Sequence, residues 1–377
     1  MSQFKPQKTP RGVYYDEMGT RRVSYRQRRA NSITGALLFA ILFLVVILIA
    51  LFAISQRNRM PEDTDPYPSS PEVTTGNTGS EALSDSQDTT AETTAPPAPA
   101  FEIRSVSNDQ IHRGELILIN GEHPFVFPDS QPQTLFYGNR STDENGKSLY
   151  GLSRADISLN TELFSLFDGM IADFARETGC KDVLITSGYR TYAFQEELYN
   201  TRVATQGEEK ARMYVAKPGY SEHHAGLAVD MVIFTGGQQY YFTDYKDAAW
   251  IVENAPDYGF IWRYTEEKKE ITGCASEPWH YRYIGAPHAR LCTDLGYCFE
   301  EYHAYLKEYT WEGDRLLIAE DGTVSVTDGM NLPESGYMIY TVPANTEGDT
   351  TEIPVPPGAD CRISGDNAGG FIVTVLL

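Results

Sequence analysis

An uninterrupted apolar run near the N-terminus constrains this chain more than any other feature of its sequence. All twenty residues from Gly35 to Ile54 are apolar or glycine. Twenty helical residues extend about 30 Å, the thickness of a bilayer's hydrocarbon core. A helix of a soluble core shows polar positions every three or four residues, and this run shows none. We therefore expect one transmembrane helix over residues 33–56.

The charges on either side of the run predict its orientation. Residues 1–30 contain eight Lys or Arg residues and two acidic ones, whereas only Arg57 and Arg59 follow the run before an acidic stretch. The positive-inside rule then makes residues 1–32 a basic cytoplasmic tail and places the rest of the chain outside. A cleaved signal peptide would have an apolar region of roughly 7–15 residues and a small-x-small cleavage site. Because Ala50-Leu-Phe-Ala53 has the wrong spacing, the sequence favours an uncleaved membrane anchor.

A change in composition marks a linker over residues 57–100. Residues 61–100 are rich in Pro, Ser and Thr and contain eight acidic residues, no basic ones and the single aromatic Tyr67. Such a segment cannot bury enough apolar surface to offset the entropy lost on ordering. We expect a disordered acidic tether.

The remaining residues are rich in aromatics and long enough for a substantial core. The whole chain carries a net charge of −21 although its first 30 residues are basic, so the part outside the membrane is strongly acidic. This charge argues against nucleic acid as a partner. Nothing in the sequence indicates a protein partner. The five cysteines are an odd number, and only Cys292 and Cys298 are spaced for a local pair, which the sequence alone cannot establish.

Helical and strand patterns mix along this region without a regular βαβ rhythm, which favours an α+β fold. Two domains are expected, a compact one over residues 101–312 and a small β-rich C-terminal extension over residues 313–377. The expected helices cover residues 161–178, 193–203, 208–216 and 245–255, and the expected strands cover residues 116–120, 124–127, 183–187, 227–234, 259–262, 337–342, 352–355 and 370–377.

Two short segments carry the residue types of a catalytic metal site. Ser221–Asp230 contains two histidines and an aspartate, and Glu277-Pro-Trp-His280 adds a glutamate and a histidine. A catalytic zinc site uses three nitrogen or oxygen ligands from the protein and leaves a position for water. His223, Asp230 and His280 are the predicted ligands of Zn2+, and Glu277 remains as the base that takes a proton from water. The chain is therefore expected to be a metallohydrolase.

The spacing of these residues does not by itself demonstrate that they meet. His223 and Asp230 are seven residues apart, which excludes the helical pair of an HExxH site. A loop through Gly226 into a strand is needed to bring them together. Glu277 and His280 are three residues apart, so a regular strand would point them to opposite faces, and Pro278 is expected to bend the chain.

Three motifs in this order resemble the VanY-type zinc D,D-carboxypeptidases and the related L,D-carboxypeptidases of bacterial cell walls. The motifs are Ser187-Gly-Tyr-Arg190, Ser221-x-His223-x-x-Gly226-x-Ala228-x-Asp230 and Glu277-Pro-Trp-His280. The resemblance covers about residues 103–310. It implies a compact α+β metallopeptidase domain that removes D-alanine from peptidoglycan stem peptides.

The resemblance also implies roles for individual residues. Arg190 matches the arginine that steadies the scissile carbonyl or the substrate carboxylate. Gln195, Ser221 and Tyr264 match positions that line the substrate pocket. The expected function is a D,D-carboxypeptidase acting on stem pentapeptides outside the cell membrane. Two alternatives stay open: L,D-carboxypeptidase action on tetrapeptides, and a silent peptidoglycan-binding module.

Overall fold

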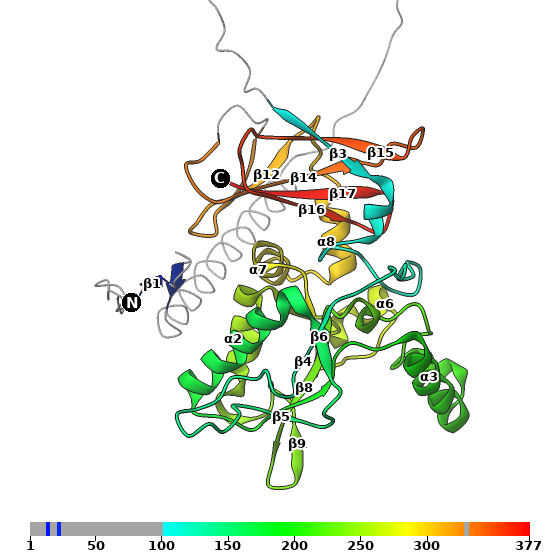
Figure 1. The fold of residues 1–377 in the computed structure, drawn as a ribbon, viewed down its shortest axis with the longest axis vertical. Coiled ribbons are helices and arrows are strands. Elements are labelled where there is room, and N and C mark those ends of the chain that lie inside the picture. Colours follow the sequence, from blue (N-terminus) through cyan, green and yellow to red (C-terminus); the bar gives the residue numbers. More distant parts are fainter. Residues whose placement is uncertain (1–12, 16–20, 24–100, 328–331) are drawn as a thin grey trace, which may run out of the picture. The chain divides into compact units, whose positions relative to one another are not determined.

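The computed structural model describes residues 13–15, 21–23, 101–327 and 332–377 (Figure 1). The chain divides into two compact units, Met1–Thr90 and Ala91–Leu377. In the first unit, β1 (Val13–Tyr15) pairs antiparallel with β2 (Arg21–Val23). The predicted transmembrane helix over residues 33–56 and the linker over residues 57–100 lie outside the described residues. Among the residues that are described, none of the helices has the length and apolar character needed to cross a bilayer.

The second unit contains a mixed sheet in which β10, β11, β8, β7 and β5 follow one another, while β9 pairs with β8. All pairs are antiparallel except β5 with β7, as an α+β fold predicts. A separate antiparallel pair joins β4 and β6. The strands are β4 (Gln133–Leu135), β5 (Gly151–Leu152), β6 (Ser158–Asn160), β7 (Val183–Ser187), β8 (Ala228–Thr235), β9 (Gln238–Tyr240), β10 (Phe260–Trp262) and β11 (His280–Tyr283).

Seven α-helices surround or follow this sheet in the described part of the unit. The longest begins where the side chain of Asn160 accepts a hydrogen bond from the amide of Glu162, and it ends at Gly179, which adopts a left-handed conformation. The helices are α2 (Thr161–Thr178), α3 (Tyr192–Gln206), α4 (Glu208–Arg212), α5 (Ala249–Asn254), α6 (Lys269–Thr272), α7 (Ala286–Asp294) and α8 (Phe299–Leu306).

Three local expectations were wrong. The helix expected over residues 208–216 ends at Arg212. Beyond it, the amide of Ala275 donates to the carbonyl of Met213, and the side chain of Gln195 donates to the carbonyl of Ala216, so these carbonyls are not available to continue the helix. The strands expected over residues 116–120 and 124–127 are irregular, since their backbone groups are paired by side chains and loops from the end of the chain.

The C-terminal part forms a five-stranded antiparallel sheet with the order β13, β12, β14, β17, β16. Its strands are β12 (Arg315–Ile318), β13 (Val324–Thr327), β14 (Tyr337–Pro343), β16 (Cys361–Gly365) and β17 (Gly370–Leu376). A further pair joins β15 (Thr350–Val355) to β3 (Glu102–Ser107). The strand β3 comes from the start of the expected 101–312 domain, and it nevertheless pairs with the C-terminal region.

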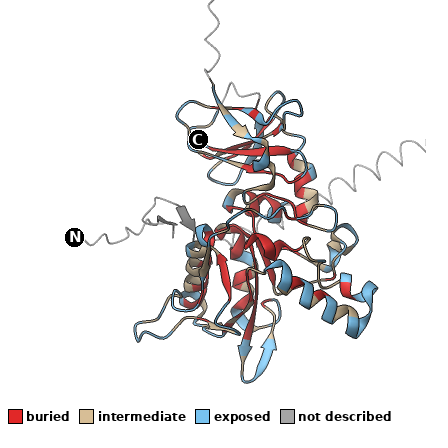
Figure 2. Ribbon diagram, turned by 45° about the vertical axis from the view of Figure 1, so that its right-hand side comes forward, coloured by how far each residue is buried: buried red, intermediate tan, exposed pale blue. Residues whose placement is uncertain are grey.

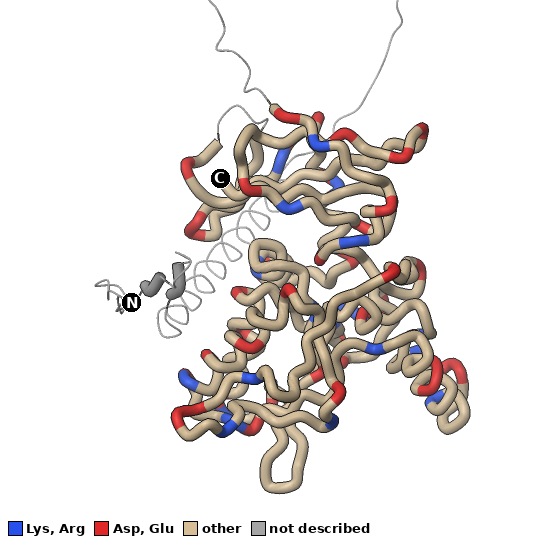
Figure 3. Tube along the Cα trace, in the orientation of Figure 1, with Lys and Arg blue, Asp and Glu red and all other residues tan. Residues whose placement is uncertain are grey.

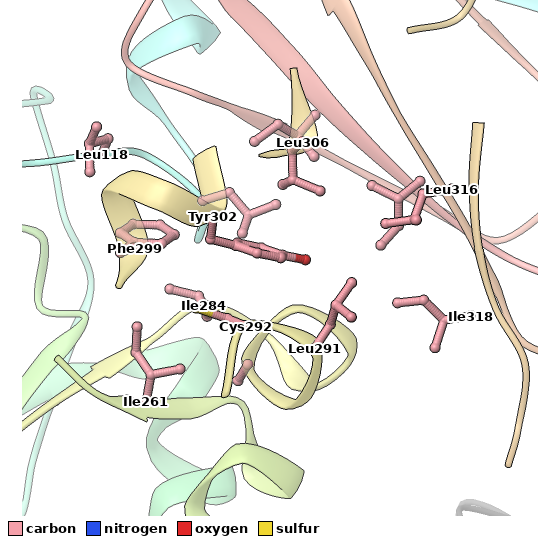
Figure 4. Packing of buried hydrophobic residues seen from close by; sticks show 14 residues of the cluster. Leu118, Ile261, Ile284, Leu291, Cys292, Phe299, Tyr302, Leu306, Leu316 and Ile318 are labelled. Atoms are coloured by element: carbon pink, nitrogen blue, oxygen red, sulfur yellow. The ribbon is translucent and has the colours of Figure 1, made fainter. Parts of the chain in front are cut away.

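Both faces of this C-terminal sheet are covered. On one face, Leu316, Ile339 and Ile372 belong to a cluster with buried residues of helices α7 and α8. Figure 4 shows Leu316 of β12 with Leu291 of α7 and Tyr302 of α8 in this cluster. On the other face, Met338 and Tyr340 pack with Ile353 of β15. Neighbouring residues of β14 alternate between the two clusters, as the pleat of a strand requires. Figure 2 shows the buried residues concentrated in the strands and in the helix faces packed against them.

All five cysteines lie in the described residues and are free. The local pair that the sequence left open between Cys292 and Cys298 is absent. The thiol of Cys292 donates a hydrogen bond to the carbonyl of Tyr297, and Cys298 caps the start of α8.

Candidate metal and peptidase site

The pairing of β8 with β11 brings two of the predicted ligands face to face. Asp230 and His280 are direct partners in the antiparallel register. His223 lies in a 3-10 turn over Glu222–Ala225, immediately before β8. Gly226 ends this turn with φ +67°, in the left-handed region that favours glycine. This turn resolves the seven-residue spacing, because it folds His223 back onto Asp230.

The three side chains are buried, and one ligand atom from each lies within 4.8 Å of the others. His223 Nε2 is 3.3 Å from Asp230 Oδ1, and His280 Nδ1 is 3.0 Å from the same oxygen. Two imidazole nitrogens and one carboxylate oxygen are the donors of a catalytic zinc site. The residues therefore fit a zinc ion with an open coordination position.

The other nitrogen of each imidazole has its own partner. His223 Nδ1 is 2.7 Å from the carbonyl of Gly188, and His280 Nε2 is 3.0 Å from Glu222 Oε2. Since a carbonyl and an ionised carboxylate only accept hydrogen bonds, these two nitrogens carry the protons. The opposite nitrogens, His223 Nε2 and His280 Nδ1, are the atoms directed at Asp230. Burial lowers the pKa of His223 to about 4. Burial also acts to lower the pKa of His280, but the bonds to Asp230 and Glu222 outweigh it and raise that pKa to about 9.

A tight turn places Glu277 next to the ligands. The amide of His280 donates to the carbonyl of Glu277 at 3.1 Å, and the amide of Glu277 donates to the carbonyl of Tyr264 at 2.9 Å. As a result Glu277 Oε2 lies 3.8 Å from His280 Nδ1, despite the three-residue spacing. Burial raises the pKa of the Glu277 carboxyl to about 7.

Arg190 reaches the site from the loop after β7. Its Nη2 lies 2.5 Å from Asp230 Oδ2, its Nε donates to Ser187 Oγ at 2.8 Å, and its Nη1 donates to Gln195 Oε1 at 3.4 Å. Its backbone carbonyl is 2.8 Å from Nδ1 of His224. Arg190 thus stands as a fixed cation beside the oxygen of Asp230 that does not face the histidines.

A pocket opens over these groups, and two of the three predicted substrate-binding residues, Ser221 and Tyr264, line it. The third, Gln195, is fully buried, and it bonds Arg190 and the carbonyl of Ala216. The lining residues are Arg190, Tyr214, Val215, Ala216, Tyr220, Ser221, Glu222, His223, Asp230, Tyr264, Cys274, Glu277, Trp279 and His280.

Sequence reasoning missed a buried cluster of charges behind His280. Arg263 Nε donates to Glu222 Oε1 at 2.8 Å, and the rest of its guanidinium donates to both oxygens of Glu300, at 2.8 and 2.6 Å. Arg282 Nε lies 3.6 Å from Glu222 Oε1. Charged residues occur throughout this unit (Figure 3), but few are buried as these are. The one signal of this cluster in the sequence was Glu222, which directly precedes the predicted ligand His223.

Comparisons with known proteins agree with this geometry. A family model described as D-alanyl-D-alanine carboxypeptidase, VanY, matches residues 156–286. A D-alanyl-D-alanine carboxypeptidase of Enterococcus faecium is 33% identical over 273 residues, which cover 72% of this chain and 78% of that protein.

The chain is also similar to solved structures. The vancomycin-resistance D,D-dipeptidase VanXYg, in complex with a D-Ala-D-Ala phosphinate analogue, is 26% identical with a TM-score of 0.60; the match covers 74% of this chain and all of that one. A variant of the D,D-pentapeptidase VanY from a VanB-type cassette, in complex with Zn(II), is 32% identical with a TM-score of 0.39; the match covers 50% of this chain and 98% of that one. The resemblance inferred from the three motifs is confirmed: this chain belongs to the VanY family of D-alanyl-D-alanine carboxypeptidases.

Proposed function

We propose that the protein is a membrane-anchored zinc D,D-carboxypeptidase that removes the terminal D-alanine from peptidoglycan stem pentapeptides outside the cell. The observation that carries this proposal is the convergence of His223, Asp230 and His280 with a free carboxylate and a fixed guanidinium around one pocket. A binding module has no need of Glu277 beside a complete ligand set.

The residues divide the chemistry between them. A bound zinc ion supplies Lewis-acid chemistry that activates water for attack on a peptide bond. Glu277, beside the ligand atoms, accepts a proton from the attacking water and delivers it to the amine of the departing D-alanine. Arg190 offers a guanidinium to negative charge on the substrate, either the terminal carboxylate or the scissile carbonyl as it becomes tetrahedral. In an acidic protein, such a local cation is needed to hold an anionic peptide end.

The membrane anchor rests on the apolar run from Gly35 to Ile54 and on the basic residues before it. In membranes prepared from cells, we expect the full chain to sediment with the bilayer and to resist extraction by high salt. External protease applied to intact spheroplasts should remove the catalytic part. Recovery of the full chain in the soluble fraction would contradict this anchor.

The activity test uses the purified full-length chain loaded with zinc. It is incubated separately with stem pentapeptide, stem tetrapeptide and D-Ala-D-Ala, and the products are weighed by mass spectrometry. We expect the pentapeptide to lose one alanine while the tetrapeptide stays intact. Cleavage of the tetrapeptide alone would make the protein an L,D-carboxypeptidase. No cleavage despite bound zinc would favour a binding module. The His223→Ala variant, which lacks one ligand, is the matched metal-free control.

A further inference from the structure

The glutamate that precedes the first predicted ligand is buried against the last one. Glu222 Oε2 lies 3.0 Å from His280 Nε2, and the Glu222 side chain is 1% exposed. We propose that Glu222 is a positioning residue of the metal site, whose carboxylate holds His280 with Nδ1 directed at the metal. This inference rests on the proposed zinc function.

The direction of the hydrogen bond follows from the charge of Glu222. An ionised carboxylate only accepts, so His280 Nε2 must donate its proton to Glu222. The opposite nitrogen, Nδ1, is the atom that lies 3.0 Å from Asp230 Oδ1 within the ligand cluster. In the zinc-bound site Nδ1 would bind the metal, so Nε2 would keep its proton, and Glu222 would accept that proton and hold the ring in the orientation that binding needs. An anionic acceptor also raises the basicity of the ligating nitrogen.

The two ligand histidines are held by acceptors of different strength. His223 donates to a neutral backbone carbonyl, that of Gly188, which a side-chain substitution cannot remove. His280 donates to a charged side chain that can be replaced. His280 is thus the ligand whose support can be tested by mutation.

Two arginines face the Glu222 carboxylate in its buried position. Arg263 donates to it directly, and Arg282 lies 3.6 Å away. Burying such a cluster costs several kcal/mol for each ion, and packed apolar residues of similar volume are often as stable. An ion cluster that served stability alone would have no reason to end on a metal ligand. Its position on His280 is explained if the charge serves the metal.

The test compares two glutamates that bond the same arginine. In the full-length chain, Glu222→Gln keeps the shape of the side chain but removes the charge beside His280. Glu300→Gln also removes a carboxylate from Arg263, but Glu300 makes none of the described hydrogen bonds or ion pairs with a ligand residue. Zinc affinity is measured by competition with a chromophoric chelator, and folding by urea denaturation.

We expect Glu222→Gln to bind zinc about 10–100-fold more weakly than the parent protein, as other changes behind metal ligands do. Glu300→Gln should unfold at lower urea and keep the parent affinity when folded. Unchanged zinc affinity in Glu222→Gln would overturn the proposal. Equal losses of affinity in both variants would also overturn it, because the effect would then come from the ion cluster as a whole.

Two further measurements keep the test decisive. If Glu222→Gln does not fold, the double variant Glu222→Gln/Arg282→Met removes one charge of each sign and should fold with the same loss of zinc affinity. Parent-like affinity in that variant would overturn the proposal. The parent protein reports separately on the proposed function: if it binds no zinc, the zinc function itself fails, and the inference fails with it.

Discussion

The two large sheets of the catalytic unit bury different kinds of side chain. One face of β8 and β11 carries Asp230, His280 and Arg282, with Glu222 and Arg263 packed against them, whereas the neighbouring strand residues Val229 and Met231 are buried and apolar. The C-terminal sheet presents apolar residues on both faces of β14 and β17. Burying apolar area stabilises a fold by roughly 25 cal/mol per Å², whereas burying charge is costly even when it is paired. The charged face of β8 and β11 is therefore organised for chemistry, whereas the apolar clusters on β14 and β17 contribute stability. Substitutions on the charged face should lower activity, and substitutions in the clusters should lower the free energy of unfolding.

The largest effect is expected from Glu277→Gln. It removes the proposed base, so turnover of stem pentapeptide should fall by about 10²–10⁴-fold. Zinc content should stay at one ion per chain, and the urea midpoint should stay equal or rise, because a costly buried carboxylate is neutralised. Metal analysis, D-alanine release and urea denaturation measure the three quantities. Retained cleavage would refute the assignment of the base.

Arg190→Met should reduce kcat/KM by about 10²–10³-fold. The variant also removes the cation that lies 2.5 Å from Asp230 Oδ2. We therefore expect zinc to bind at least as tightly as in the parent protein, as measured with a competing chelator. A loss confined to KM would assign Arg190 to the substrate carboxylate, and a loss in kcat would assign it to the scissile carbonyl. Weaker zinc binding would instead make Arg190 part of the metal site.

Ser364→Ala tests the contact between the irregular segment 116–120 and strand β16 of the C-terminal sheet. Ser364 Oγ accepts a hydrogen bond from the buried amide of Leu116 at 2.9 Å, so the variant leaves this donor without its acceptor. We expect the free energy of unfolding to fall by about 1–3 kcal/mol, with kcat close to that of the parent protein. Urea denaturation and steady-state kinetics measure these values. A large loss of kcat in folded protein would show that the C-terminal sheet also contributes to activity, which contradicts the proposed difference between the two sheets.

Ile339→Val should have the smallest effect. Ile339 is fully buried between β14 and the helices α7 and α8, and the change removes one methylene group. A loss of about 0.5–1.5 kcal/mol in unfolding free energy is expected, with zinc affinity and kcat unchanged. A change in either functional quantity would show that the C-terminal core does more than stabilise the fold.

The sequence predicted the features that carry a local signal. The apolar spacing and the caps of α2 lie within one segment, and so do the apolar runs of β7 and β8. The three ligand positions were predicted because zinc requires particular side chains, although the seven-residue spacing did not say how they meet.

The rest depended on contacts between distant segments. Residues 116–120 look like a strand, but Ser364 and Asn367 bond their backbone groups from far along the chain. The roles of Glu222 and Arg263 could not be predicted for the same reason. Neither residue shows its partner until β10, β11 and α8 are placed side by side.

The pairing of β3 with β15 has a consequence for how the protein is made. Asn108, just after β3, bonds Thr351 of β15 across 243 residues of chain. At about 5–20 residues per second, a ribosome needs roughly 12–50 s to synthesise that interval. During this time β3 has no partner, and an unpaired strand edge invites pairing with other chains. The nascent chain is therefore at risk of aggregation through β3 until β15 has been synthesised.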